Sequence, residues 1–286
     1  MPKKEPVILI LWRLLYPILI FYGVELVLET GYTMICSAAF VAADASLAAD
    51  EEALYEMVLN EVYDKSLYLT GIRSLILIPI YILLMVQDGK RDRRLGQEKH
   101  YAPYAKGWLA LLPVAGFTAA LGFNQMIDIM DLQRFSPRYQ AASEIIYSGS
   151  VWLTILVSAV LAPVVEEFLF RGLVYRRLRK HAAPVVCALV SSLLFGLVHG
   201  NLVQFVYAFL VGMLICWVYE KFKTIWAPIL FHAGANLIAV ILTEFVPAFG
   251  GGMSLGSLML LTVGWLAATF MLLWLIHRRV NREIGE

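Results

Sequence analysis

Apolar residues along this chain gather in runs of about 20, separated by short polar segments. A helix rises about 1.5 Å per residue, so a run of that length crosses the ~30 Å hydrocarbon core of a membrane. The pattern predicts about eight such spans: Val7–Leu28, Tyr68–Gln87, Gly107–Ile127, Val151–Phe170, Pro184–Val198, Leu202–Tyr219, Ile225–Phe245 and Leu255–Ile276. The fifth and sixth spans are short and closely joined. We therefore expect an all-α, polytopic membrane helix bundle.

The composition agrees with a membrane protein. Of the 286 residues, 60% are hydrophobic and only 16% are charged, which is more apolar surface than a water-soluble domain can hide. Three cysteines without motif spacing exclude a secreted disulfide scaffold. The formal net charge of +1 excludes nucleic-acid binding driven by bulk charge. We expect the lipid bilayer, and no nucleic acid, among the partners of this chain.

Lysine and arginine gather in alternate segments of the chain. They occur at Lys3 and Lys4, within 88–106, within 171–180, at 221–223 and at 278–282. With eight crossings, all of these segments lie on one side of the membrane, and the positive-inside rule predicts cytosolic N- and C-termini. The first span is longer than the 7–15 apolar residues of a signal peptide, so we expect it to be an uncleaved anchor.

The segment 29–66 should lie on the opposite side of the membrane. It holds eight acidic residues and one lysine. Within it, Leu54, Met57, Val58 and Val62 recur at helical spacing. The pattern predicts an acidic outer loop that contains a helix.

Several polar side chains fall inside predicted spans. A charge near the bilayer centre costs at least ~2.5–3.5 kcal/mol, so such a residue indicates function. Arg13, Glu25 and Arg73 lie near the ends of the first two spans, where we expect them to snorkel toward water. A second group lies deeper, in the second half of the chain, and consists of Glu166, Glu167, Arg171, His199, His232 and Asn236.

The spacing of the first three deep residues divides their roles. Glu167 and Arg171 are four positions apart, so they can pair on one face of a helix. Glu166 is rotated by about 100° from Glu167 and has no cationic partner on its own helix. An unpartnered carboxylate in an apolar setting is a candidate acid/base catalyst. The sequence therefore predicts a structural Glu167 and a catalytic Glu166.

The depth of the remaining residues is compatible with one site. Glu166 and His199 are 33 positions apart, with the turn His181–Pro184 midway between them. In an antiparallel helix pair, both residues then lie ~21 Å from the turn and can face each other. His232 and Asn236 share one helix face, and their span places them at a similar depth. We expect these side chains to meet in the cytosolic half of the bilayer.

At these residues the sequence resembles the CPBP family, which contains the CAAX proteases and bacteriocin-processing enzymes. The three motifs of that family stand here in order, as Glu166-Glu167-xxx-Arg171, Phe195-xxx-His199 and His232-xxx-Asn236. The resemblance covers about residues 150–245, which it marks as a catalytic core. Residues 1–149 then form an N-terminal transmembrane region with the acidic extracytoplasmic loop, and residues 246–286 form the final span and a basic cytosolic tail.

The resemblance implies an intramembrane endopeptidase of the glutamic type. In this interpretation Glu166 activates a water molecule, His199 assists in positioning and proton transfer, and His232 with Asn236 lines an oxyanion hole. Glu167 and Arg171 would hold the site together. The implied substrate is a membrane-associated peptide or protein, such as a pheromone precursor, a bacteriocin precursor or a lipidated C-terminus. The expected location is a bacterial plasma membrane.

Three alternatives remain open at this stage. Glu166, His199 and His232 could bind zinc and leave one position open for water. The chain has no HExxH motif, and an asparagine suits an oxyanion donor better than a zinc ligand, so we expect no cofactor. The second alternative is a non-enzymatic immunity or scaffold protein of the same fold. The third is a proton-coupled transporter, against which the lack of inverted repeats argues.

Overall fold

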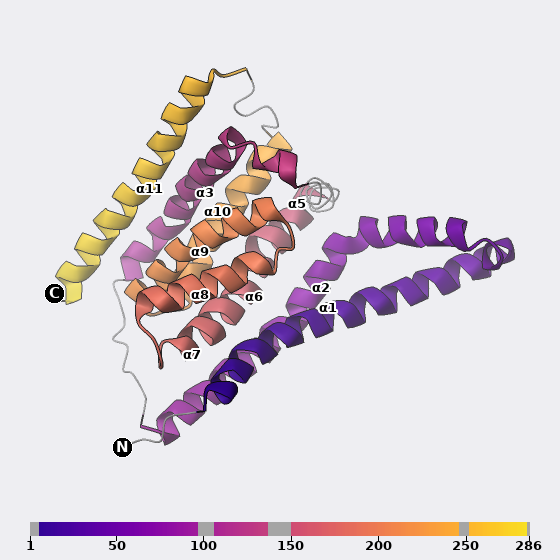
Figure 1. Cartoon of the computed structure of the whole chain (residues 1–286), viewed down its shortest axis with the longest axis horizontal. Helices are drawn as coiled ribbons and strands as arrows, with labels where there is room; N and C mark the ends of the chain where they lie inside the picture. Colours follow the sequence, from indigo (N-terminus) through magenta and orange to yellow (C-terminus); the bar gives the residue numbers. More distant parts are fainter. Residues whose placement is uncertain (1–5, 97–105, 137–149, 246–251, 285–286) are drawn as a thin grey trace.

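The computed structural model describes residues 6–96, 106–136, 150–245 and 252–284, and helices make up nearly all of this part (Figure 1). The separate helices are α1 (Val7–Ala43), α2 (Glu51–Arg94), α3 (Leu112–Ile129), α8 (Pro184–Leu197), α9 (Leu202–Phe222), α10 (Trp226–Phe245) and α11 (Leu255–Ile284). One further continuous helix comprises α5 (Val151–Thr154), η4 (Ile155–Leu161), α6 (Ala162–Glu167), η5 (Phe168–Tyr175) and α7 (Arg176–Leu178). Short helical turns are η1 (Ala45–Ala48), η2 (Lys106–Leu111) and η3 (Leu132–Phe135). The predicted all-α fold is confirmed.

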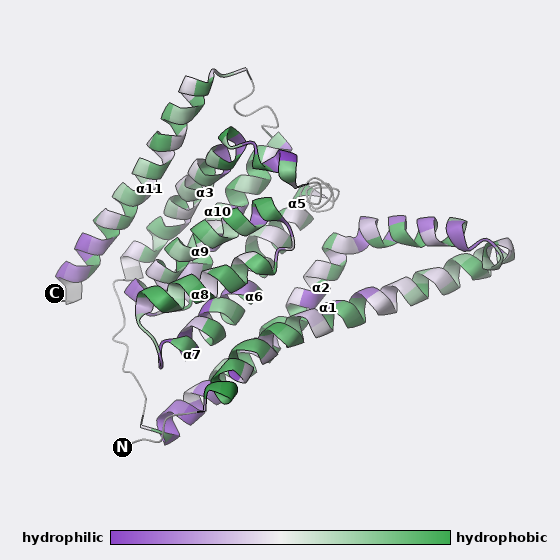
Figure 2. Cartoon of the chain, in the orientation of Figure 1, coloured by the Kyte–Doolittle hydropathy of each residue, from purple (hydrophilic) through white to green (hydrophobic). Residues whose placement is uncertain are grey.

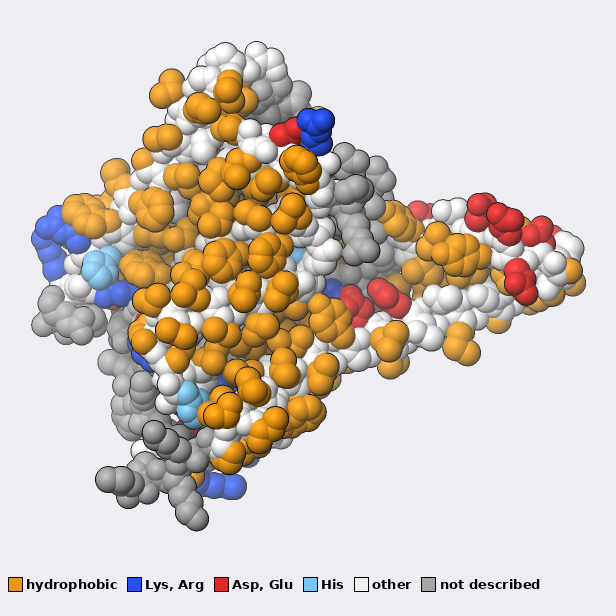
Figure 3. All heavy atoms as spheres, in the orientation of Figure 1, with side chains coloured by type: hydrophobic (Ala, Val, Ile, Leu, Met, Phe, Trp, Pro, Cys, Tyr) orange, Lys and Arg blue, Asp and Glu red, His pale blue; other side chains and the backbone are white. Residues whose placement is uncertain are grey.

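The helix lengths define a multi-pass membrane protein. Among the described residues, seven helices are long and apolar enough to cross a membrane. The fifth predicted span, α8, has 14 residues, or about 21 Å, and is too short to cross ~30 Å of hydrocarbon. The sixth, α9, is not short, because it continues for 21 residues. Hydrophobic residues cover most of the face of the bundle seen in Figures 2 and 3. The N-in/C-in orientation stays a prediction.

The segment 29–66, predicted as an acidic outer loop that contains a helix, is mostly helical. Helix α1 continues to Ala43 because its sequence stays apolar well beyond Leu28. Helix α2 begins at Glu51, where the side chain of Asp50 accepts the N–H of Ala53 at 3.0 Å. The predicted helix around Val58 is confirmed as part of α2. With 37 and 44 residues, or about 55 and 66 Å, the two helices form a hairpin whose end projects away from the bundle (Figure 1).

Charged side chains of this hairpin pair with each other. Arg13 of α1 lies 2.7 Å from the Asp88 carboxylate of α2. Arg73 of α2 pairs with Glu25 of α1. The expectation that Arg13, Glu25 and Arg73 snorkel stays a prediction, and the structure adds that each has an oppositely charged partner on the neighbouring helix. A nearby ion-pair partner satisfies such a side chain without a path to water.

A proline in α1 connects the hairpin to the long helix Val151–Leu178. Pro17 has no N–H, so the carbonyl of Arg13 loses its donor within α1. Arg177 donates a hydrogen bond to this carbonyl, and its Nε donates to Asp88 Oδ2 at 2.6 Å. Arg177 is buried. The contact fixes the end of the long helix against both helices of the hairpin.

Basic segments that are distant in the sequence lie at one end of the molecule. The contacts that join them are Arg176 and Lys180 with Asp92, Arg179 and Lys223 with Glu220, and Lys221 with Asn281. They connect the ends of α2, α7, α9 and α11, as the charge pattern predicts. Lys3, Lys4 and Lys99 lie outside the described residues. The two predicted boundaries within the chain, near residues 150 and 246, border segments that are also outside them.

Helices α3 and α10 touch along their backbones. A Cβ atom on Gly116 would lie 1.9 Å from the carbonyl oxygen of Phe231. A Cβ atom on Gly234 would lie 2.1 Å from the carbonyl oxygen of Pro113. Small residues allow such close crossings in membranes, where van der Waals contact drives helix association. The crossing also fixes the height of His232, two residues before Gly234.

We expect Gly234→Ala to destabilise the fold. The added methyl group meets backbone rather than a movable side chain, so the loss should reach at least the ~1–3 kcal/mol typical of overpacking. The matched control is Gly264→Ala in α11, where no atom lies within 4 Å of the added Cβ. This control should gain up to ~1 kcal/mol from helix propensity. Thermal unfolding of both variants in detergent measures the difference, and equal midpoints would contradict the packing argument.

Candidate active site

The long helix Val151–Leu178 changes its winding on both sides of the glutamate doublet. The N–H of Ala162 donates to the carbonyl of Val157, and the N–H of Arg176 donates to that of Arg171. Both bonds reach back five residues rather than four, as in a π-helix. Helix α6, which ends with Glu166 and Glu167, lies between these two widened stretches. Widened turns of this kind are rare and frequently occur at functional sites.

Glu167 is the buried centre of the site. Its side chain has no exposed surface. Oε1 accepts a hydrogen bond from Arg171 Nη1 at 2.9 Å and lies 2.8 Å from Nδ1 of His232. The pair Glu167–Arg171 that the spacing predicts is therefore present. His232 of α10 is an additional partner that the sequence does not reveal.

Arg171 connects Glu167 to two further helices. Its Nη2 donates to the carbonyl of Gly212 in α9 at 2.9 Å. The guanidinium lies 4.8 Å from the ring centroid of Phe195 in α8, within cation–π distance. A Cβ atom on Gly212 would lie 3.2 Å from Arg171 Nη2, so the glycine makes room for the guanidinium. The arginine is fully buried and anchors α8 and α9 around the doublet.

His232 lies between the two glutamates. Because the Glu167 carboxylate only accepts hydrogen bonds, we assign the proton to Nδ1 of His232. The other ring nitrogen, Nε2, lies 3.6 Å from Oε2 of Glu166. The Glu166 side chain is 20% exposed, against 0% for Glu167. The structure thus places one glutamate in a buried ion pair and leaves the other open to the site.

His199 joins this group through an aromatic ring. Its Nδ1 lies 2.8 Å from the carbonyl oxygen of Phe195, so Nδ1 is the donor and Nε2 is the nitrogen left for chemistry. The Phe195 ring is edge-on to His199 at 5.0 Å and to His232 at 5.5 Å between centroids. Within the described residues, Glu166 and His199 share no hydrogen bond. The direct approach of Glu166 to His199 stays a prediction, because the structure joins them only through His232 and the Phe195 ring within the described residues.

Asn236 is held by a backbone group of the long helix. Its amide nitrogen donates to the carbonyl of Ser158 at 2.8 Å. That carbonyl needs a donor, because the N–H of Ala162 reaches Val157 instead and Pro163, five residues on from Ser158, has no N–H. Asn236 therefore has a structural partner that the motif alone does not predict. It lies half-buried one turn from His232.

The described residues do not converge as a metal site. No group of three His, Cys, Asp or Glu side chains in the described part of the chain is arranged to hold a metal ion. Glu166 lies 3.6 Å from His232, and the His199 ring packs against Phe195 with 5.0 Å between centroids. The donor set Glu166, His199 and His232 thus does not fit a three-ligand zinc centre in this arrangement.

Some groups that form the site cannot be identified from the sequence. The carbonyls of Ser158 and Gly212 are backbone groups, and only Pro163, next to the doublet, indicates that a carbonyl nearby lacks its donor. Tyr22 of α1 lies with its hydroxyl 3.5 Å from the carbonyl of Val198, the residue before His199. Helix α1 therefore borders the site, although no motif residue lies in it.

Comparison with known proteins matches the region that holds all of these motifs. The family model described as "Rce1-like: Type II CAAX prenyl endopeptidase Rce1-like" matches residues 148–238. The Bacillus subtilis (strain 168) protein named "Putative membrane peptidase YdiL" is 30% identical over 181 residues, which are 61% of this chain and 71% of that protein. No solved structure matches the chain.

We expect Glu167→Ala to lower the stability of the folded protein as well as its activity. The change leaves Arg171 and His232 buried without their shared acceptor, and breaking a buried pair in this way costs about 3–5 kcal/mol. Glu56→Ala, an exposed acidic residue of α2, is the matched control. Size-exclusion chromatography and thermal unfolding in detergent measure the folded fraction. Equal stability of the two variants would show that the ion pair contributes nothing.

Asn236→Ala should destabilise the long helix by about 1–3 kcal/mol, because the carbonyl of Ser158 then lacks a donor. Pro163→Ala restores an N–H that this carbonyl can accept within the widened turn. The double variant should therefore lose less free energy of unfolding than the two single variants lose in sum. A double-mutant cycle in thermal unfolding measures this difference. Strictly additive losses would refute the pairing of Asn236 with a proline-freed carbonyl.

Proposed function

Since this chain belongs to the Rce1-like family of type II CAAX prenyl endopeptidases and is an intramembrane peptidase, we propose that Glu166 activates the water with which it hydrolyses a peptide bond. The proposed substrate is a membrane-associated peptide or protein. The proposed location is a bacterial plasma membrane, since a bacterial protein named as a membrane peptidase is similar over most of its length.

One observation carries the mechanism. Oε2 of Glu166 lies 3.6 Å from Nε2 of His232, and Glu167 holds the opposite nitrogen of that ring at 2.8 Å. Glu166 takes a proton from water, and the resulting hydroxide attacks the carbonyl carbon of the scissile bond. His232, held in one orientation by Glu167, shares the proton with Glu166 through Nε2. No serine or cysteine nucleophile takes part.

The developing negative charge needs hydrogen-bond donors. An asparagine amide has two N–H groups, and Asn236 donates one of them to the carbonyl of Ser158. In the proposed mechanism the second N–H, together with protonated Nε2 of His232, stabilises the oxygen of the tetrahedral intermediate. A single donor of this type is worth about 3–4 kcal/mol in a site that excludes water. The contact with Ser158 orients the amide in advance.

The reaction ends when the C–N bond breaks and the amine nitrogen takes up a proton. Glu166 returns the proton that it took from water, either directly or by way of Nε2 of His199. His199 presents Nε2 because Nδ1 is bound to the carbonyl of Phe195. The edge-on ring of Phe195 restrains both imidazoles, so that His199 and His232 keep their relative positions during turnover.

We expect Glu166→Gln to abolish cleavage while the protein stays folded. Glutamine keeps the size of the side chain but cannot take a proton from water, and general-base catalysis contributes about 10²–10⁴-fold. The measurement compares peptide termini, by mass spectrometry, in membranes that contain equal amounts of the wild type or the variant. Glu56→Gln, which removes an exposed carboxylate from α2, should leave the termini unchanged.

Each outcome separates this mechanism from an alternative. Undiminished cleavage by Glu166→Gln would exclude Glu166 as the base. Inhibition of the wild type by a chelator, reversed by zinc, would favour the zinc-dependent version with Glu166, His199 and His232 as ligands. A folded wild type that generates no new termini from a broad set of membrane peptides would favour a scaffold role.

A further inference from the structure

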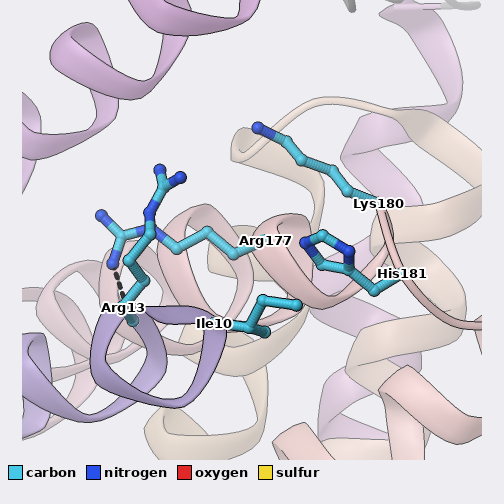
Figure 4. A pocket seen from close by; sticks show the side chains of 5 residues that line it. All are labelled: Ile10, Arg13, Arg177, Lys180 and His181. Atoms are coloured by element: carbon cyan, nitrogen blue, oxygen red, sulfur yellow. Dashed lines mark hydrogen bonds between the residues drawn. The ribbon is translucent and has the colours of Figure 1, made fainter. Parts of the chain in front are cut away.

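A second polar site lies at the basic end of the molecule. A small, half-open hollow lies between the start of α1 and the turn that follows α7. Its lining consists of Ile10, Arg13, Arg177, Lys180 and His181 (Figure 4). Arg177 lies 11 residues, or about 16 Å, beyond Glu166 along the same helix. The hollow is therefore separate from the candidate active site.

The cations of this hollow are held in place by two aspartates of α2. Asp88 lies 2.7 Å from Arg13 and 2.6 Å from Arg177. Asp92 pairs with Lys180, and it also lies 3.3 Å from Arg176. Four basic residues thus face two acidic ones, so the cluster keeps an excess of positive charge.

Both aspartates are almost completely buried. Among the described residues, neither they nor any other acidic side chain lines the hollow. Figure 4 shows the guanidinium groups of Arg13 and Arg177 side by side, with Lys180 and His181 on the adjacent turn. Arg177 donates to Asp88, to the carbonyl of Arg13 and to the Tyr16 hydroxyl, so it contributes positive charge to the hollow. The ion pairs hold Arg13 and Lys180 in place, which lowers the entropic cost of binding an anion.

The surroundings of the hollow are apolar. The first turns of α1 expose Val7 at 71%, Ile8 at 74% and Leu11 at 48%. Helix α8, which begins just after His181, exposes Val185 at 66%. In a membrane protein such surfaces contact acyl chains. A ligand that satisfies both features has an anionic head group and an apolar tail.

We propose that this hollow binds the phosphate group of an anionic phospholipid, with the acyl chains along the start of α1. Basic pockets between transmembrane helices are suited to such head groups, and guanidinium groups bind phosphate oxygens through charge-assisted hydrogen bonds. The bound lipid bridges α1 and the helix that carries Glu166. The proposal does not depend on the catalytic mechanism.

The test uses the full chain purified in detergent and titrated with dioleoylphosphatidylglycerol, with bound lipid counted by native mass spectrometry. In the variant Lys180→Gln/His181→Ala, Asp92 still has Arg176 as a partner, and thermal unfolding without lipid checks the fold. We expect its lipid affinity to fall about fivefold, which corresponds to ~1 kcal/mol for one basic residue. The control Arg278→Gln removes one exposed charge from α11 and should bind the lipid as the wild type does.

Two further probes identify the source of the phosphate. Dioleoylphosphatidylcholine, which has no net charge, should bind more weakly than dioleoylphosphatidylglycerol. Inorganic phosphate at millimolar concentration should not displace the bound lipid. Displacement of the lipid by phosphate would overturn the lipid assignment in favour of free phosphate. Unchanged affinity of the double variant, or an equal loss in Arg278→Gln, would overturn the site itself.

Discussion

The buried contact among Glu167, Arg171 and His232 is the interaction on which the rest of the core depends. A charge that is removed from water must find a partner, and in a membrane the nearest partners are other helices. Glu167 needs Arg171, which also uses the carbonyl of Gly212 and the ring of Phe195. His232 then draws α10 against the same carboxylate. Helices α8, α9 and α10 converge on α6 and η5 because one ion pair requires contacts from all of them.

Prolines supply a second constraint. In the bilayer a carbonyl that loses its donor cannot turn to water, so another polar group of the protein must satisfy it. Arg177 does so for Arg13, upstream of Pro17, and Asn236 does so for Ser158, upstream of Pro163. Lipid chains are as apolar as leucine and give helices little hydrophobic reason to choose one neighbour over another. These directional bonds therefore determine which helices meet and at what height.

The adjacent glutamates acquire different environments from this framework. They are rotated by about 100° from one another on α6, so only one of them can point at Arg171. The other remains partly exposed beside Nε2 of His232. The same long helix extends to Arg177, where it is fixed to the α1–α2 hairpin. The middle and the basic end of this helix thus serve different purposes, with acid–base groups in the middle and an ion-pair network at the basic end.

The sequence by itself determined the features that depend on local periodicity. Apolar runs predict the spans, the i,i+4 spacing predicts the pair of Glu167 with Arg171, and the order of three motifs identifies the family. The spacing does not predict that Arg13 and Arg73 pair across the hairpin, and it suggests that they snorkel. It also does not predict the contacts of His232 with Glu167 and of Asn236 with Ser158. Only the tertiary structure decided these, because one-dimensional spacing determines the face and depth of a residue, whereas the partner across a helix interface depends on how two helices pack and which backbone groups they leave unpaired.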